Sequence, residues 1–137
     1  MRIRSFAGAI LIVALTAVVA IAAGAHFLGT PTLSTDSQKL TVCASVAGLG
    51  NADISVTVSA TATTTCTNKG NNVPPGQTET VSGSKSNIHT ENGRADFCVT
   101  TNSASNPCPD GMKPQTTFSN VKISVYQGGK LVLQQTF

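Results

Sequence analysis

The chain has 137 residues, few charges and few aromatic side chains, and these properties exclude several functions. Its formal net charge of +3 includes Arg2 and Arg4 at the N-terminus; the other basic residues nearly balance the acidic ones and do not cluster. Nucleic-acid binding needs a basic surface, usually with aromatic side chains that stack on bases. Trp is absent and Tyr126 is the single Tyr, so we expect no nucleic-acid partner and no aromatic platform for sugars.

The N-terminal segment is apolar and predicts export. Residues 6–25 carry no charge and follow two arginines, an arrangement typical of a secretory signal peptide. Ala23-Gly24-Ala25 has the small-x-small form that signal peptidase cleaves, so we expect a signal peptide over residues 1–25; Ala20-Ile21-Ala22 is a second candidate. The run is also long enough to span a bilayer, so an uncleaved membrane anchor is the alternative. In both cases the following domain lies outside the cytoplasm, secreted or on the extracellular face of the cell envelope.

After this segment, residues 26–38 are expected to form an extended linker and residues 39–137 one domain with a single core. Residues 40–46 and 54–63 alternate apolar and polar side chains, which predicts two half-buried strands. Turn residues at 48–51 separate them and suggest a hairpin, in which Cys43 lies opposite about Val56.

A second hairpin is predicted around Asn92-Gly93, the strongest short hairpin signal. A polar loop over residues 67–77 and a weak strand over residues 78–84 precede it. Strands over residues 86–91 and 94–101 then pair Glu91 with Arg94, His89 with Asp96 and Ile88 with Phe97. In this register Ile88 and Phe97 face inward, whereas His89 and Asp96 face solvent.

The C-terminal residues predict a third hairpin, with strands over 118–126 and 130–137. We expect a three-residue loop with Gly129 in a bulge position, which pairs Val125 with Leu131 and Ile123 with Leu133. A two-residue loop pairs Val125 with Val132 instead and divides the apolar faces.

The four cysteines all follow the apolar segment, and an even number in an exported domain indicates two disulfides. A metal site is not expected, because no C-x-x-C occurs and only His26 and His89 are available as histidine ligands. Cys43 and Cys98 both lie on the polar face of their strands, and Cys66 and Cys108 border polar loops. The hairpin through residues 48–51 places Cys43 far from Cys66, so we favour the pairs Cys43–Cys98 and Cys66–Cys108.

Six or seven short strands without helical periodicity predict an all-β fold, an Ig-like antiparallel β-sandwich. The segments that carry a resemblance are VAGLGN at 46–51, CTNKGNN at 66–72, PPGQ at 74–77, ENGRADF at 91–97 and VYQGGKLVLQQTF at 125–137. With them the chain resembles small secreted bacterial β-sandwich proteins of uncharacterised activity. The resemblance implies a bacterial envelope or extracellular setting and no active site.

His89 and Asp96 are the one pair with chemical interest, since a carboxylate can orient an imidazole as a general base. No nucleophile motif accompanies them, so we interpret them as a cross-strand surface pair and expect no catalytic residues, no metal and no cofactor. The hydroxyl-rich run at 63–67 resembles the ladders of surface-binding proteins, but it has no repeat and is explained by strand propensity.

These observations favour a non-catalytic secreted or cell-surface module with a structural, adhesive or protein-interaction role. The alternative is a subunit of an extracellular filament assembled by strand exchange, with self-association through edge strands. A small secreted hydrolase or inhibitor is the third hypothesis. A membrane partner is expected only if the N-terminal segment stays uncleaved.

Overall fold

The computed structural model describes residues 24–68, 70 and 76–137, which form an all-β sandwich of two antiparallel sheets. The predicted signal peptide lies outside the described residues except for residues 24 and 25. Sheet A contains β1 (His26–Phe27), β2 (Thr32–Asp36), β3 (Lys39–Ala47) and β6 (Ala95–Thr100). Sheet B contains β4 (Ile54–Thr67), β5 (Gln77–Ile88), β7 (Lys113–Gln127) and β8 (Lys130–Thr136).

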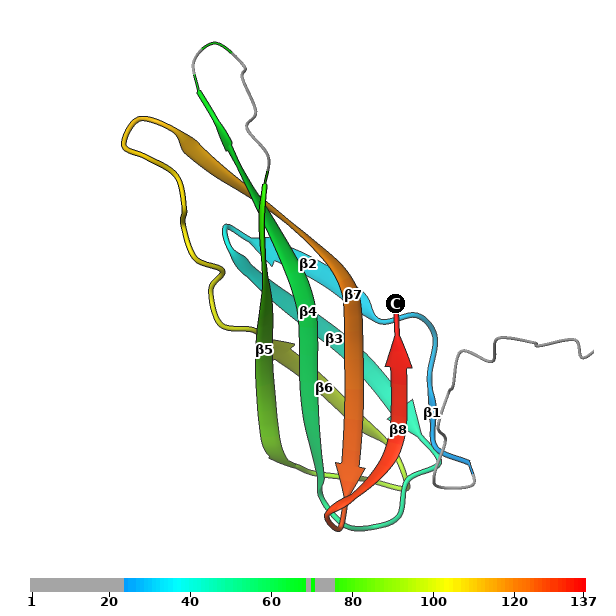
Figure 1. The fold of residues 1–137 in the computed structure, drawn as a ribbon. Coiled ribbons are helices and arrows are strands. Elements are labelled where there is room, and N and C mark those ends of the chain that lie inside the picture. Colours follow the sequence, from blue (N-terminus) through cyan, green and yellow to red (C-terminus); the bar gives the residue numbers. More distant parts are fainter. Residues whose placement is uncertain (1–23, 69, 71–75) are drawn as a thin grey trace, which may run out of the picture.

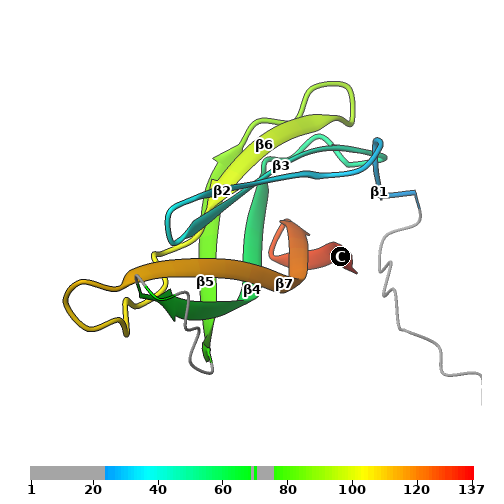
Figure 2. The same cartoon turned by 90° about the horizontal axis from the view of Figure 1, so that it is seen from above.

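In sheet A, β3 pairs with β1 and β2 along one edge and with β6 along the other, while sheet B has the order β5-β4-β7-β8. Figure 2 shows the two sheets as separate layers, and Figure 1 shows the long strands β4 and β7 side by side. Within the described part of the chain, no helix has the length and apolarity that crossing a membrane requires.

The core lies between the sheets, and most of its side chains are valine or alanine. Along β4 every second residue is buried, which is the alternation that the sequence predicts for a strand with one solvated face. β6 alternates in the same way, with Phe97 buried and Asp96 exposed. The largest side chains that are fully buried are Leu40, Ile54, Ile123, Val42, Val46, Val56, Val58, Val81 and Val125.

The expected hairpin through residues 48–51 is wrong, because β3 belongs to sheet A and β4 to sheet B. The connection crosses from one layer to the other, so Cys43 does not lie opposite Val56. The two strands each bury an apolar face, and placing them in opposite sheets brings those faces together across the core.

The predicted hairpin around Asn92-Gly93 is also wrong beyond its tip. Asn92 and Gly93 have φ values of 52° and 74°, and Glu91 and Arg94 exchange backbone hydrogen bonds of 2.8 and 2.9 Å, as expected. The arms then separate, because Ile88 pairs with Ile54 in sheet B and Phe97 pairs with Ala44 in sheet A. The expected pairs Ile88–Phe97 and His89–Asp96 therefore do not form, although the inward and outward faces are as predicted.

The third hairpin has a register that neither expected loop gives. Gly128 and Gly129 form a two-residue turn with φ values of 61° and 77°, so Gln127 pairs with Lys130. An irregularity follows, which pairs Val125 with Leu133 instead of Leu131. The β-bulge therefore lies within the paired strands and not in the loop. Both Val132 and Leu133 are buried beside it.

Residues 26–36, expected as a linker, add two strands to sheet A. Phe27 pairs with Val46, and β2 pairs along its full length with β3 through a tight turn after Asp36. The ring of Phe27 lies 5.7 Å from that of Phe137, edge to face, and so contacts the C-terminus beside β8. The described residues form eight strands rather than the six or seven expected.

A connecting segment, residues 101–108, ties the two sheets together and is called the strap. Its backbone donates hydrogen bonds to β3 and to the turn before it, from Thr101 to the carbonyl of Leu40 and from Ala104 to that of Gln38, each 2.8 Å. On sheet B, Ser105 donates to the carboxylate of Glu79 through both its backbone N–H and its hydroxyl. The strap therefore connects the two layers at one end of the core, where Ala104 packs in the same cluster as Ala60 and Ala62 of β4.

At the opposite end, the amide of Gln127 holds the connection between β3 and β4. Its Oε1 accepts from the backbone N–H of Gly50 at 2.8 Å, and its Nε2 donates to the carbonyls of Gly50 and Ala52, each at 2.7 Å. The hydroxyl of Thr90 donates to the same Ala52 carbonyl at 2.9 Å. One side chain thus satisfies three backbone groups of a connection between layers.

We predict that Ile88→Ala lowers the free energy of unfolding by about 2–5 kcal/mol, because it leaves a cavity in the core. His89→Ala, at the neighbouring exposed position, changes it by less than about 1 kcal/mol. Urea unfolding of the oxidised protein measures both values, and equal losses at the two positions contradict the inward and outward assignment.

Gln127→Glu is predicted to lower the free energy of unfolding by about 1–3 kcal/mol, because a carboxylate oxygen replaces the amide donor opposite two carbonyl groups. Gln115→Glu, an exposed glutamine on the same strand, is the matched control. Thermal unfolding of both variants tests whether the Gln127 amide holds the connection between β3 and β4. A similar loss of stability at the two positions argues against that role.

Candidate functional site

The outer face of sheet B carries rows of hydroxyl side chains. The outward residues of β4 from Ser55 to Thr67 are all Ser or Thr. The strand registers place further hydroxyls beside them: Thr57 lies between Ser84 and Ser124, and Thr61 lies between Thr80 and Ser119. We call this surface the hydroxyl face; it consists of Thr57, Ser59, Thr61, Thr63, Thr78, Thr80, Ser82, Ser84, Thr117, Ser119, Lys122 and Ser124.

The hydroxyl face is almost uncharged, since Lys122 is its one ionisable residue. Neighbouring strands lie about 4.8 Å apart and alternate residues about 6.7 Å apart along a strand, so the hydroxyls of β4 and β5 form an approximately regular array. On the β7 side the array is interrupted, because the β4–β7 register shifts between Ser59 and Thr61. Each hydroxyl both donates and accepts hydrogen bonds. The buried Ser124 is covered by Gln134, whose amide donates to its hydroxyl oxygen at 2.9 Å. The surface is therefore suited to many simultaneous hydrogen bonds with a neutral partner.

The sequence revealed this surface only in part. The run at 63–67 is not one ladder, because Thr64 points inward, is 3% exposed and hydrogen-bonds through its hydroxyl to that of Thr116 at 2.9 Å. The rows consist instead of alternate residues on three strands. Their alignment depends on the registers of β5 and β7 against β4, which the sequence alone does not provide.

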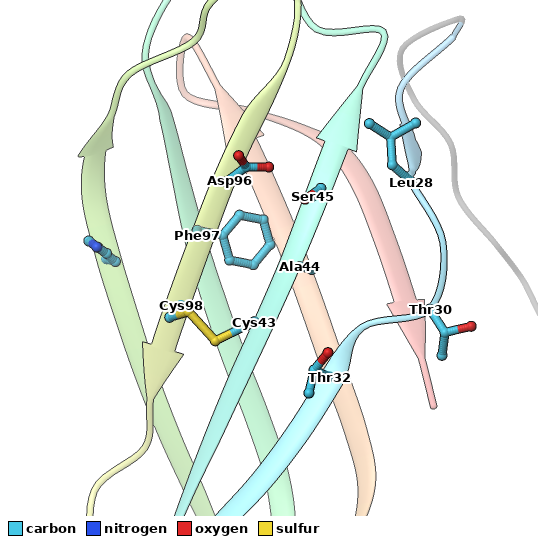
Figure 3. A pocket seen from close by; sticks show the side chains of 10 residues that line it. Leu28, Thr30, Thr32, Cys43, Ala44, Ser45, Asp96, Phe97 and Cys98 are labelled. Carbon is cyan, nitrogen blue, oxygen red and sulfur yellow. A yellow bond between two sulfur atoms is a disulfide. The ribbon is translucent and has the colours of Figure 1, made fainter.

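The outer face of sheet A holds the first disulfide. Cys43 and Cys98 are direct partners in the β3–β6 register, with α-carbons 4.1 Å apart, and the structure joins them as the sequence favours. Figure 3 shows the bridge crossing an open depression, with Asp96 and Ser45 on one flank and Thr32 of β2 on the other. Thr41 and Thr100 extend the polar surface beyond the bridge and share a hydroxyl hydrogen bond of 2.9 Å.

The second disulfide, Cys66–Cys108, is also the pair that the sequence favours, with α-carbons 5.5 Å apart. It fastens the end of the strap to the end of β4. Two disulfides in a domain of this size are typical of proteins in an oxidising, extracytoplasmic environment.

The structure separates His89 from its expected partner. His89 Nδ1 lies 3.6 Å from a carboxylate oxygen of Asp53, and Asp96 stands on β6 in the other sheet. The side chains of His89 and Asp53 are 81% and 55% exposed, so solvent screens their interaction. His89 and Asp96 border the same open depression, together with Glu91 and Arg94. Among the described residues, no group of three or more His, Cys, Asp or Glu side chains is placed to hold a metal ion.

Comparison with known proteins identifies no family. The chain matches no protein-family model, and no similar protein is found among curated proteins or solved structures. The resemblance in turn and strand segments thus corresponds to an all-β, two-disulfide fold and not to an identified family.

Removal of either disulfide, as Cys43→Ser with Cys98→Ser or as Cys66→Ser with Cys108→Ser, is predicted to lower the free energy of unfolding by about 2–4 kcal/mol. The two losses should be similar, because the bridges close loops of comparable length, with sequence separations of 55 and 42. Chemical unfolding measures them, and non-reducing peptide mapping checks the pairing. A peptide that links Cys98 to Cys108 contradicts it.

Proposed function

We propose that this protein is a non-catalytic β-sandwich module outside the cytoplasm, and that its hydroxyl face binds an extended neutral polysaccharide. The observation that carries the proposal is the array of hydroxyls aligned across β5, β4 and β7. The two disulfides and the apolar N-terminal segment support an extracytoplasmic location.

The chemistry of the face selects the partner. A surface with one charge among twelve residues offers little to an acidic or basic polymer, but its hydroxyls match the alternating donors and acceptors of a sugar chain. Each hydrogen bond contributes only about 0.5–1.5 kcal/mol net, since water competes for the same groups. Binding therefore needs many contacts at once, which an insoluble or extended polymer supplies and a short oligosaccharide does not.

The scaffold that we propose is Ig-like. An Ig sandwich places its second and fifth strands together in one sheet and its third, sixth and seventh strands together in the other. The neighbours β3 and β6 in sheet A and the order β4-β7-β8 in sheet B support this assignment, with β5 as an additional edge strand.

A self-contained module is favoured over a filament subunit that exchanges strands. Residues 26–37, the segment that a strand-exchanging subunit would donate to a neighbour, pair here with the same chain, β1 and β2 with β3. The exposed position of His89 and its neighbour Asp53 supports a surface role over a hydrolytic one.

Thr80→Glu tests the proposal by placing a carboxylate at an exposed position of the hydroxyl face. Its matched control is Ser34→Glu, at an exposed position of β2 in sheet A. The protein secreted from the full chain and both variants are incubated with insoluble cellulose, chitin and β-1,3-glucan, three uncharged polysaccharides, and the bound fraction is measured. We expect the native protein and Ser34→Glu to bind at least one polymer, and Thr80→Glu to lose most of that binding.

Absence of binding to all three polymers contradicts the proposal, as does equal binding by the two variants. Size-exclusion chromatography over a range of concentrations tests whether a second copy of the chain covers the hydroxyl face instead. Oligomers that disappear in Thr80→Glu assign the hydroxyl face to a second copy of the chain.

A further inference from the structure

The residues immediately before β1 belong to the folded domain. Ala25 is 7% exposed and packs with the buried residues of the core. The ring nitrogen Nδ1 of His26 lies 2.6 Å from the carbonyl oxygen of Gly24 and fixes the path of the chain into β1. Gly24 and Ala25 thus have defined positions in the sandwich.

Gly48 provides the space that these two residues occupy. A β-carbon added at Gly48 would lie 1.8 Å from the carbonyl oxygen of Gly24 and 3.0 Å from the backbone nitrogen of Ala25. The backbone of residues 24 and 25 therefore rests directly on the α-carbon of Gly48, where any side chain would displace it. This contact and the burial of Ala25 are independent observations that the domain is built around both residues.

The two cleavage motifs have different consequences for this arrangement. Cleavage after Ala25 removes a core side chain, empties the space above Gly48 and places a charged α-amino group on His26, which pairs with Ala47. Cleavage after Ala22 keeps Gly24 and Ala25 and leaves the new charge ahead of β1.

We propose that signal peptidase cleaves this protein after Ala22, so that the mature chain begins at Ala23. Ala20 and Ala22 supply the two small side chains that the peptidase requires. Water hydrolyses the peptide bond between Ala22 and Ala23, leaving a carboxylate on Ala22 and an α-amino group on Ala23. The proposal depends on the packing of residues 24 and 25 and is independent of what the hydroxyl face binds.

The experiment is expression of the full chain in a secreting bacterial host, followed by intact mass measurement and N-terminal sequencing of the product. We expect an N-terminal Ala23. The alternative product differs by the mass of Ala23-Gly24-Ala25, so the two are resolved. An N-terminal His26, or a membrane-bound product that retains residues 1–22, overturns the proposal.

Two glycine variants test the packing in the secreted protein. Gly48→Ala and Gly29→Ala are matched, because their φ values are +72° and +73°, but an added β-carbon at Gly29 meets nothing within 4 Å. Both variants incur the cost of a positive φ, and only Gly48→Ala displaces residues 24 and 25. We expect its melting temperature to be lower than that of Gly29→Ala by at least about 4 °C.

Failure to recover secreted Gly48→Ala under conditions that yield Gly29→Ala supports the same conclusion. Equal melting temperatures show that residues 24 and 25 do not lie on Gly48 in the mature protein and overturn the proposal.

Discussion

The constraint on which this structure depends is the small volume of its core side chains. The fully buried positions are mostly valine, with alanines such as Ala60 and Ala62 continuing along β4. A core of this kind buries little apolar area per residue, and in a domain of this size that limits the stability available from burial. The connections between the layers therefore carry additional ties: the strap with its disulfide at one end, and the amide of Gln127 at the other. The disulfide Cys43–Cys98 adds a further covalent tie within sheet A.

Which face of each strand is buried was predictable, because alternation in the sequence records burial directly. Which strand pairs with which was not. Asn92-Gly93 specifies a two-residue turn, and the turn forms, but its chemistry does not determine whether the flanking strands remain paired. Ile88 and Phe97 are both buried in the core, but they enter it from opposite sheets rather than as neighbours in one. The same reasoning explains the connection at residues 48–53, where turn residues join two layers.

The disulfide pairing was predictable from the faces of the cysteines, although one step of that argument was wrong. Cys43 and Cys98 share the polar face of sheet A, as their positions in the two alternating strands indicate. The exclusion of Cys43–Cys66 relied on a hairpin that does not exist; the separation holds because β3 and β4 lie in different sheets. The hydroxyl face was the least predictable feature. Its central strand is visible in the sequence, but the rows arise only from the registers of β5 and β7.

The outer faces of the two sheets differ in how much they contribute to holding the fold together. Sheet A carries the Cys43–Cys98 disulfide on its outer face, β1 and β2 pair along one edge of its strand β3, and the strap hydrogen-bonds to the start of that strand. The exposed hydroxyls of sheet B take no part in the ties that hold the layers together. A single exposed substitution of this kind changes stability by about 0.5 kcal/mol or less. A change such as Thr80→Glu therefore alters the chemistry of the surface while leaving the fold intact, and a loss of binding there reports on recognition rather than on unfolding.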